Sequence, residues 1–212
     1  INNMNLEGKT FILQGLGNVG YHAARILSSY GMVLIGIGNA NGYWKNTDGF
    51  NIYQIKKYIE EHGEDLNNYC SDSIDKSDFF SIECDVIIPA ALELQITEEE
   101  AKVINTNLIV EAANGPTDEI AEEILLDKNV EIIPDILANS GGVICSYYEW
   151  LQNINHTYNY YNINDILSNH MENKCKEINN LMKIHDQKSM RIICYYLALK
   201  SIQGVYENKG LL

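Results

Sequence analysis

The stretch Thr10-Phe-Ile-Leu-Gln14, continued directly by Gly15-Leu-Gly-Asn-Val-Gly20, decides the fold of this chain. A short apolar strand runs into a Gly-x-Gly-x-x-Gly turn, and a helical apolar pattern begins immediately after it. In such a unit the first glycine allows a sharp turn, the second lets a pyrophosphate approach the backbone, and the third lets the helix pack against the strand. The segment therefore predicts a dinucleotide site at the N-terminus of a helix.

The glycines alone are weak evidence, because three glycines in six residues also occur in turns that bind nothing. The flanking pattern favours the stronger interpretation. Residues 23–27 give the predicted helix an apolar face, Gly31 suits the position just after its end, and a second apolar run begins at Met32, where the next parallel strand should start.

Strand and helix patterns alternate from residue 10 to about residue 135, which predicts an α/β fold with a Rossmann-like, doubly wound, mostly parallel sheet. The expected strands are residues 10–14, 32–37, 85–88, 107–111 and 130–133, and the expected helices between them are residues 18–30, 51–61, 97–103 and 117–127. Longer helices are expected at residues 142–152, 163–184 and 188–207. We therefore expect an NAD(P)-binding domain over residues 1–150, followed by C-terminal helices over residues 151–212 that pack on it.

Composition limits the class of protein. The 212 residues carry a formal net charge of −14, which disfavours nucleic acid and anionic membranes as partners. No apolar stretch approaches the roughly 20 residues of a transmembrane helix. The five cysteines are far apart and show neither disulfide-framework nor metal-ligand spacing, so we expect reduced thiols, no metal site and a soluble intracellular protein, cytoplasmic rather than organellar. Because the chain begins with Ile1 and not Met, we expect a fragment or a processed product.

Asn39 stands 19 residues after Gly20, where dinucleotide-binding proteins commonly place an acid that bonds the adenosine ribose. An asparagine can still bond a ribose hydroxyl and does not repel a 2′-phosphate. The nearest basic residue is Lys45. The sequence therefore leaves NAD and NADP open. The alternative interpretation of Asn39 is a turn residue between Gly38 and Gly42.

The later predicted strands also end in small and amide residues. Strand 85–88 is followed by Pro89-Ala-Ala91, strand 107–111 by a segment that contains Asn114, and strand 130–133 by a segment that contains Asn139. Ligands of doubly wound sheets bind beyond these carboxyl ends, where an amide can bond a carboxamide or a carboxylate. Either asparagine could instead bond its own loop.

Five of these segments, in the same order and with similar gaps, resemble those of glutamate dehydrogenases. They are Gln14-Gly-Leu-Gly-Asn-Val-Gly20, Cys84-Asp-Val-Ile-Ile-Pro-Ala-Ala91, Glu111-Ala-Ala-Asn-Gly-Pro-Thr117, Pro134-Asp-Ile-Leu-Ala-Asn-Ser-Gly-Gly-Val143 and Ser146-Tyr-Tyr-Glu-Trp150. The last segment favours glutamate dehydrogenase over the related leucine and phenylalanine dehydrogenases, and the short tail resembles the simpler hexameric enzymes.

The resemblance implies oxidative deamination of L-glutamate to 2-oxoglutarate and ammonia, with hydride transfer to NAD(P). The cofactor residues that it implies are Gly15, Leu16, Gly17, Asn18, Val19 and Gly20 around the pyrophosphate, Asn39 at the adenosine ribose, Ala90 and Ala91 beside the cofactor, and Asn114 and Asn139 at the nicotinamide. The substrate residues that it implies are Asn114, Val143 and Ser146.

The chain also departs from the family pattern. Ala112 and Ser140 stand where the family commonly has glycine and alanine, and each adds a small group near the ligand path. The family's catalytic lysine and aspartate lie in an N-terminal domain whose Gly-rich lysine motif this chain lacks. We therefore expect a coenzyme-binding half that is inactive alone, a monomer or weak oligomer alone, and a homohexamer when complete. The alternatives are another amino-acid dehydrogenase and a non-catalytic NAD(P)-binding module.

Overall fold

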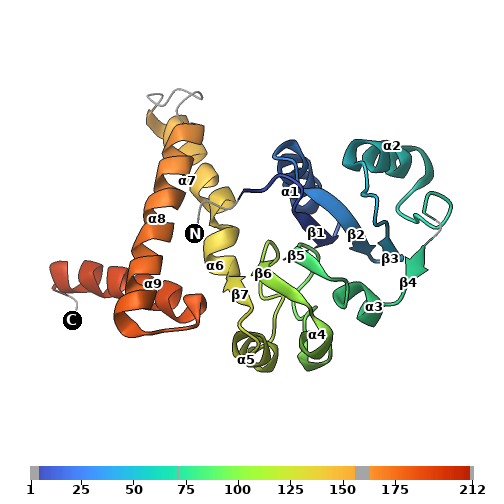
Figure 1. Ribbon diagram of the computed structural model, residues 1–212. Helices are drawn as coiled ribbons and strands as arrows, with labels where there is room; N and C mark the ends of the chain where they lie inside the picture. Colours follow the sequence, from blue (N-terminus) through green and yellow to red (C-terminus); the bar gives the residue numbers. More distant parts are fainter. Residues whose placement is uncertain (1–4, 71, 156–162, 211–212) are drawn as a thin grey trace. The chain divides into compact units, whose positions relative to one another are not determined.

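The computed structural model describes residues 5–70, 72–155 and 163–210 (Figure 1). Its contacts divide the chain between Asp135 and Ile136 into two compact units. The N-terminal unit holds the sheet and the C-terminal unit is helical. The domain boundary expected after residue 150 stays a prediction.

Within the described residues of the N-terminal unit, seven strands form one sheet in the order β4-β3-β2-β1-β5-β6-β7 (Figure 1). They are β1 (Thr10–Gln14), β2 (Val33–Asn39), β3 (Gly42–Lys45), β4 (Ser73–Ile74), β5 (Cys84–Pro89), β6 (Thr106–Val110) and β7 (Glu131–Ile133). β1 pairs in parallel with β2 on one side and with β5 on the other, and β6 and β7 continue the parallel order. The chain thus winds outward from β1 in two directions, which confirms the Rossmann-like, doubly wound fold and the five predicted strands.

The hairpin edge of the sheet was not predicted. β2 turns back into β3, which pairs with it in antiparallel fashion, and β4 pairs antiparallel with β3. The sequence does contain a signal for this hairpin, since Asn41-Gly42 lies between an apolar run and the aromatic pair Tyr43-Trp44. Because β3 has only four residues, it is too short to show the apolar periodicity by which the longer strands were predicted.

Helices cover both faces of the sheet (Figure 1). α1 (Asn18–Ser29) and α2 (Ile52–His62) pack on one face with Phe11 and Leu13. α3 (Lys76–Phe80), α4 (Glu98–Val103) and α5 (Glu119–Asp127) pack on the other with Ile12. The alternation along β1 explains this division, because neighbouring side chains of a strand point to opposite faces.

The ends of these helices follow the expected chemistry with one exception. Gly31 has φ +85°, a left-handed conformation that suits the residue after α1. The Glu100 carboxylate accepts a hydrogen bond from the Thr97 N–H at 2.9 Å at the start of α4. α5 was expected to begin at Thr117, but its cap is Asp118, whose carboxylate accepts from the Ala121 N–H at 2.6 Å, and Thr117 is buried.

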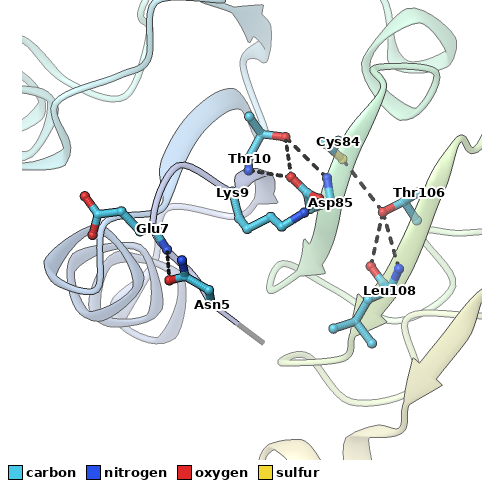
Figure 2. A network of polar contacts seen from close by, with 8 residues as sticks. All are labelled: Asn5, Glu7, Lys9, Thr10, Cys84, Asp85, Thr106 and Leu108. Carbon is cyan, nitrogen blue, oxygen red and sulfur yellow. Dashed lines mark hydrogen bonds and ion pairs between the residues drawn. The ribbon is translucent and has the colours of Figure 1, made fainter. Parts of the chain in front are cut away.

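A polar network joins the amino ends of the central strands (Figure 2). The Asp85 carboxylate accepts from the Lys9 ammonium and from the Thr10 N–H, each at 2.8 Å. Burial of the Asp85 carboxyl raises its pKa, but the hydrogen bonds from Lys9 and Thr10 outweigh burial, so the net pKa is lowered. Charge-assisted bonds of this kind fix the start of β1 against the start of β5.

The C-terminal unit consists of helices. α6 (Asp135–Ala138) begins at the boundary and is followed by α7 (Ser140–Asn155), α8 (Ile163–His185) and α9 (Met190–Asn208). α8 packs against both α7 and α9. The three long helices were predicted, although α7 is longer than expected at both ends. In the described residues, no helix is long and apolar enough to cross a membrane.

Candidate functional site

The glycine loop connects β1 to α1 and lies against the segment that follows β5. Gly15 has φ +104°, and a Cβ placed there would lie 2.6 Å from the Ala90 carbonyl oxygen. A Cβ on Gly20 would lie 1.9 Å from the Gly15 carbonyl oxygen and 3.5 Å from the Ala90 Cβ. The turn therefore requires glycine at both positions, and it brings Ala90 into direct contact with the loop.

Gly17 differs from Gly15 and Gly20, because packing does not require a glycine at this position. A Cβ there would have no heavy atom within 4 Å, and its φ of −67° suits any residue. Gly17 is the N-cap of α1, no side chain caps the helix, and its first turn holds no acidic residue. Bare N–H groups, open space above Gly17 and the positive end of a 12-residue helix together fit a pyrophosphate.

The exposure of the loop agrees with this fit. Gly17 and Asn18 are exposed, Val19 is 56% exposed and Leu16 is half-buried. The large exposed Val19 in the first turn of α1 leaves an apolar surface beside the bare helix N-terminus, against which a ribose or a ring can pack.

Two further loops lie beside the glycine loop at the carboxyl edge of the sheet. The Ala90 N–H donates to the Gln14 carbonyl oxygen at 2.7 Å, and the N–H groups of Ala112 and Ala113 donate to the Pro89 carbonyl oxygen at 3.0 and 2.9 Å. The structure thus brings together the glycine loop, Ala90 and the segment after β6. The Ala112 methyl packs against the core on the α1–α2 face, so the extra carbon is accommodated.

Glu111 and Asp135 shape this edge, although neither was among the predicted site residues. Glu111 is fully buried, and its carboxylate accepts from the Asp135 N–H at 2.8 Å. The Asp135 carboxylate accepts from the Gly115 N–H at 2.8 Å, so the segments after β6 and β7 are tied to each other. Glu111 begins the family-like segment Glu111–Thr117. A carboxylate at the end of an otherwise apolar strand is the sequence signal from which its buried role could have been predicted.

Asn39 acts as a turn residue in the β2–β3 hairpin. Its Oδ1 accepts from the Asn41 N–H, and its Nδ2 donates to the Glu64 carbonyl oxygen, each at 2.8 Å. This is the alternative that the sequence left open. An asparagine amide still has one further donor and acceptor capacity, so a ribose contact stays a prediction.

Lys45 was named as the basic residue nearest to Asn39, but the hairpin separates them. Asn39 pairs with Gly42, whereas Lys45 pairs with Gly36 at the other end of β3. Three residues of strand place the Lys45 backbone about 10 Å further along, toward the amino edge. The segment next to Asn39 instead contains Glu64 and Asp65, both exposed.

The other predicted site residues belong to different units. Asn114 is exposed in the loop after β6. Asn139, Val143 and Ser146 belong to the C-terminal unit: Asn139 is half-buried before α7, Val143 is 74% exposed, and the Ser146 hydroxyl donates to the Gly142 carbonyl oxygen at 2.9 Å.

Ser140, the second departure from the family pattern, is satisfied locally. Its hydroxyl donates to the Leu137 carbonyl oxygen at 2.7 Å, at the junction of α6 and α7. A hydroxyl that bonds its own turn does not add an unpaired polar group to the C-terminal unit. Across residues 5–70, 72–155 and 163–210, no three histidine, cysteine or acidic side chains lie close enough to hold a metal ion.

Comparison with known proteins agrees with this geometry. A model of the glutamate/leucine/phenylalanine/valine dehydrogenase family matches residues 1–210. NAD-specific glutamate dehydrogenase A of Halobacterium salinarum is 38% identical over 207 residues, which cover 97% of this chain and 47% of that protein.

Solved structures show the same fold. Glutamate dehydrogenase from Peptoniphilus asaccharolyticus superposes with a TM-score of 0.77 at 29% identity, over 96% of this chain and 47% of that chain. The hetero-hexameric glutamate dehydrogenase from Thermus thermophilus superposes with a TM-score of 0.89 at 22% identity, over 99% of this chain and 50% of that chain. The chain thus spans about half the length of these relatives, and it belongs to the glutamate/leucine/phenylalanine/valine dehydrogenase family.

Proposed function

We propose that this chain is the coenzyme-binding half of a glutamate dehydrogenase, which deaminates L-glutamate oxidatively to 2-oxoglutarate and ammonia and passes the hydride to NAD or NADP. The observation that carries the proposal is the bare N-terminus of α1 at Gly17, within a glycine loop whose Gly15 and Gly20 lie against Ala90. The 38% identity to an enzyme named as an NAD-specific glutamate dehydrogenase favours this reaction among those of the family.

The residues of the chain would divide the binding of the coenzyme among them. The glycine loop from Gly15 to Gly20 would bind the pyrophosphate through N–H groups and the helix dipole. Ala90 and Ala91 would leave room for a flat ring against the backbone, and Asn39 would bond the adenosine ribose. The bound coenzyme supplies the hydride acceptor.

The nicotinamide and substrate ends would depend on amide and hydroxyl groups. Asn114 and Asn139 carry amides that can bond a carboxamide. Asn114 of the N-terminal unit would also contribute to glutamate selection. In the C-terminal unit, Val143 and Ser146 would do so, because one hydroxyl beside an apolar side chain can bond a single carboxylate oxygen.

We infer that NAD is preferred over NADP. A 2′-phosphate near Asn39 would need a cation, but Lys45 lies about 10 Å away along its strand. Glu64 bonds Asn39 through its backbone and brings a carboxylate-bearing segment to the same place. Two like charges in one region repel, which penalises the 2′-phosphate.

We also infer that this chain alone binds coenzyme without turnover, because it lacks the lysine motif on which the family's chemistry depends. The complete enzyme would be a homohexamer, and the chain alone a monomer or weak oligomer.

Two experiments on the 212-residue chain test this function. Amide NMR signals of the glycine loop and of Ala90 and Ala91 should shift when NADH is added, and those of α5 should not. Incubation with L-glutamate and NAD should give no NADH. Shifts confined to other parts of the N-terminal unit would contradict the proposed site, and steady NADH production would contradict the need for a missing catalytic group.

A further inference from the structure

The last side chain of β1, Gln14, forms a buried polar link beneath the carboxyl edge of the sheet. Gln14 is 2% exposed and pairs with Gly38 of β2 on one side and Pro89 of β5 on the other. It therefore occupies the point at which the winding of the sheet reverses, where ligands of this fold class bind.

The amide of Gln14 connects two loops that flank this point. Its Nε2 donates to the Tyr43 hydroxyl of the β2–β3 hairpin at 3.3 Å and to Gln95 Oε1 of the β5–α4 loop at 2.9 Å. Gln95 is fixed in turn, since its Nε2 donates to the Glu93 carbonyl oxygen at 3.1 Å. These bonds determine which end of each amide is the donor.

The link extends to the loop after β6. The Gln95 N–H donates to the Pro116 carbonyl oxygen at 2.8 Å. One chain of hydrogen bonds thus joins the hairpin that carries Asn39, the loop that begins with Ala90 and the loop that carries Asn114.

Gln14 is not explained by folding stability alone. In the described residues, Gln14 Oε1 has no hydrogen-bond partner, although it is buried. Burying an acceptor without a donor lowers stability, and an apolar side chain of the same length would avoid this cost. The unpaired oxygen of Gln14 thus lowers the stability of the fold. What the side chain contributes is the pair of hydrogen bonds from Nε2 to the β2–β3 hairpin and to the β5–α4 loop.

We propose that Gln14 is a positioning residue for the coenzyme. It holds the β2–β3 hairpin, which carries the predicted adenosine-ribose contact Asn39, at a fixed spacing from the β5–α4 loop and, through Gln95, from the loop that carries Asn114 at the predicted nicotinamide end. The inference rests on the proposed coenzyme site and adds a residue beneath it that touches neither phosphate nor ring. Loss of the link would leave each half of the site intact and misplace one half relative to the other.

The test is Gln14→Met, measured by calorimetric titration with NADH and with ADP-ribose and by thermal unfolding. We expect about a tenfold weaker NADH affinity, a smaller loss for ADP-ribose, which lacks the nicotinamide end, and an unfolding midpoint that is unchanged or higher. Gln95→Met should weaken NADH similarly, and the double variant should lose little more, because both substitutions break the same link.

Gln54→Met is the matched control, since Gln54 is an exposed glutamine of α2, and it should leave both affinities unchanged. An unchanged NADH affinity in Gln14→Met would overturn the inference. So would equal losses for both ligands together with a lower unfolding midpoint, which would indicate a merely structural role. If the unchanged chain bound neither ligand, the proposed function itself would fail.

Discussion

The ideal Cβ position of Gly15 lies 2.6 Å from the carbonyl oxygen of Ala90, so the glycine loop and the β5–α4 loop touch at a residue without a side chain. Gly15→Ala adds this contact to a strained φ of +104°. We expect the free energy of unfolding to fall by about 2–4 kcal/mol in urea denaturation. A loss below about 0.5 kcal/mol would show that the loop moves freely away from Ala90.

Gly17→Ala is the matched substitution, because it adds the same methyl group in open space. Stability should change by less than about 0.5 kcal/mol, since no atom lies within 4 Å of the added carbon. NADH affinity should fall at least about tenfold, because the methyl occupies the path by which a pyrophosphate approaches the backbone. Fluorescence titration measures this, and full retention of affinity would place the phosphates elsewhere.

The Asp85–Lys9 pair predicts a loss of stability in acid. The folded pKa of Asp85 lies below its ordinary value of 3.8, so its contribution is present at neutral pH and is lost as pH falls below about 4, through the lowered folded pKa. Asp85→Asn should lower the free energy of unfolding at pH 7 by on the order of 1 kcal/mol, and should flatten its decline in acid.

Unfolding at pH 7 and at pH 3 measures this effect. Asp48→Asn, at an exposed position of the β3–α2 loop, is the control and should leave the acid dependence unchanged. An Asp85→Asn variant with the same acid dependence as the original chain would show that the pair contributes nothing.

Asn39→Asp tests the hairpin that carries the predicted ribose contact. The new carboxylate would face the Glu64 carbonyl oxygen, which now accepts from Asn39 Nδ2 at 2.8 Å, so stability should fall by about 1 kcal/mol. NADPH affinity should fall more than NADH affinity, because the added charge repels a 2′-phosphate. Equal changes for the two coenzymes, measured by calorimetry, would show that the adenosine ribose lies away from Asn39.

Thiol labelling should distinguish buried from accessible cysteines. Burial raises the pKa values of Cys70 and Cys84 to about 11, so both are protonated and shielded at pH 8. A disulfide reagent followed by peptide mass spectrometry should modify the half-buried Cys145 in the native chain and Cys70 and Cys84 only after denaturation. Rapid native modification of Cys84 would mean that the amino edge of the sheet opens.

The parallel part of the fold could be predicted because strands buried on both faces read as continuous apolar runs, as at Phe11–Leu13. The antiparallel edge could not be read in this way, since β4 has two residues and β3 has four. Thr117 shows a similar limit. A threonine before two acids looks like a helix start, but Thr117 is buried and the cap is Asp118.

In the candidate site, too, the local motifs could be predicted and the contacts between distant segments could not. The glycine loop and Ala90 could be placed together because a strand–turn–helix unit fixes local geometry and the parallel crossover brings β5 beside β1. The separation of Lys45 from Asn39 could not be predicted, because it depends on a reversal of chain direction that the periodicity did not show. The hydrogen bond between Gln14 and Gln95 joins residues far apart in sequence, and no local pattern encodes it.

The central claim is that this chain carries a working dinucleotide site, and a paired calorimetric titration with NADH and NADPH tests it most directly. The account predicts saturable binding of one equivalent of NADH, with NADPH binding more weakly. Absence of binding to both coenzymes, in a chain shown to be folded, would contradict it.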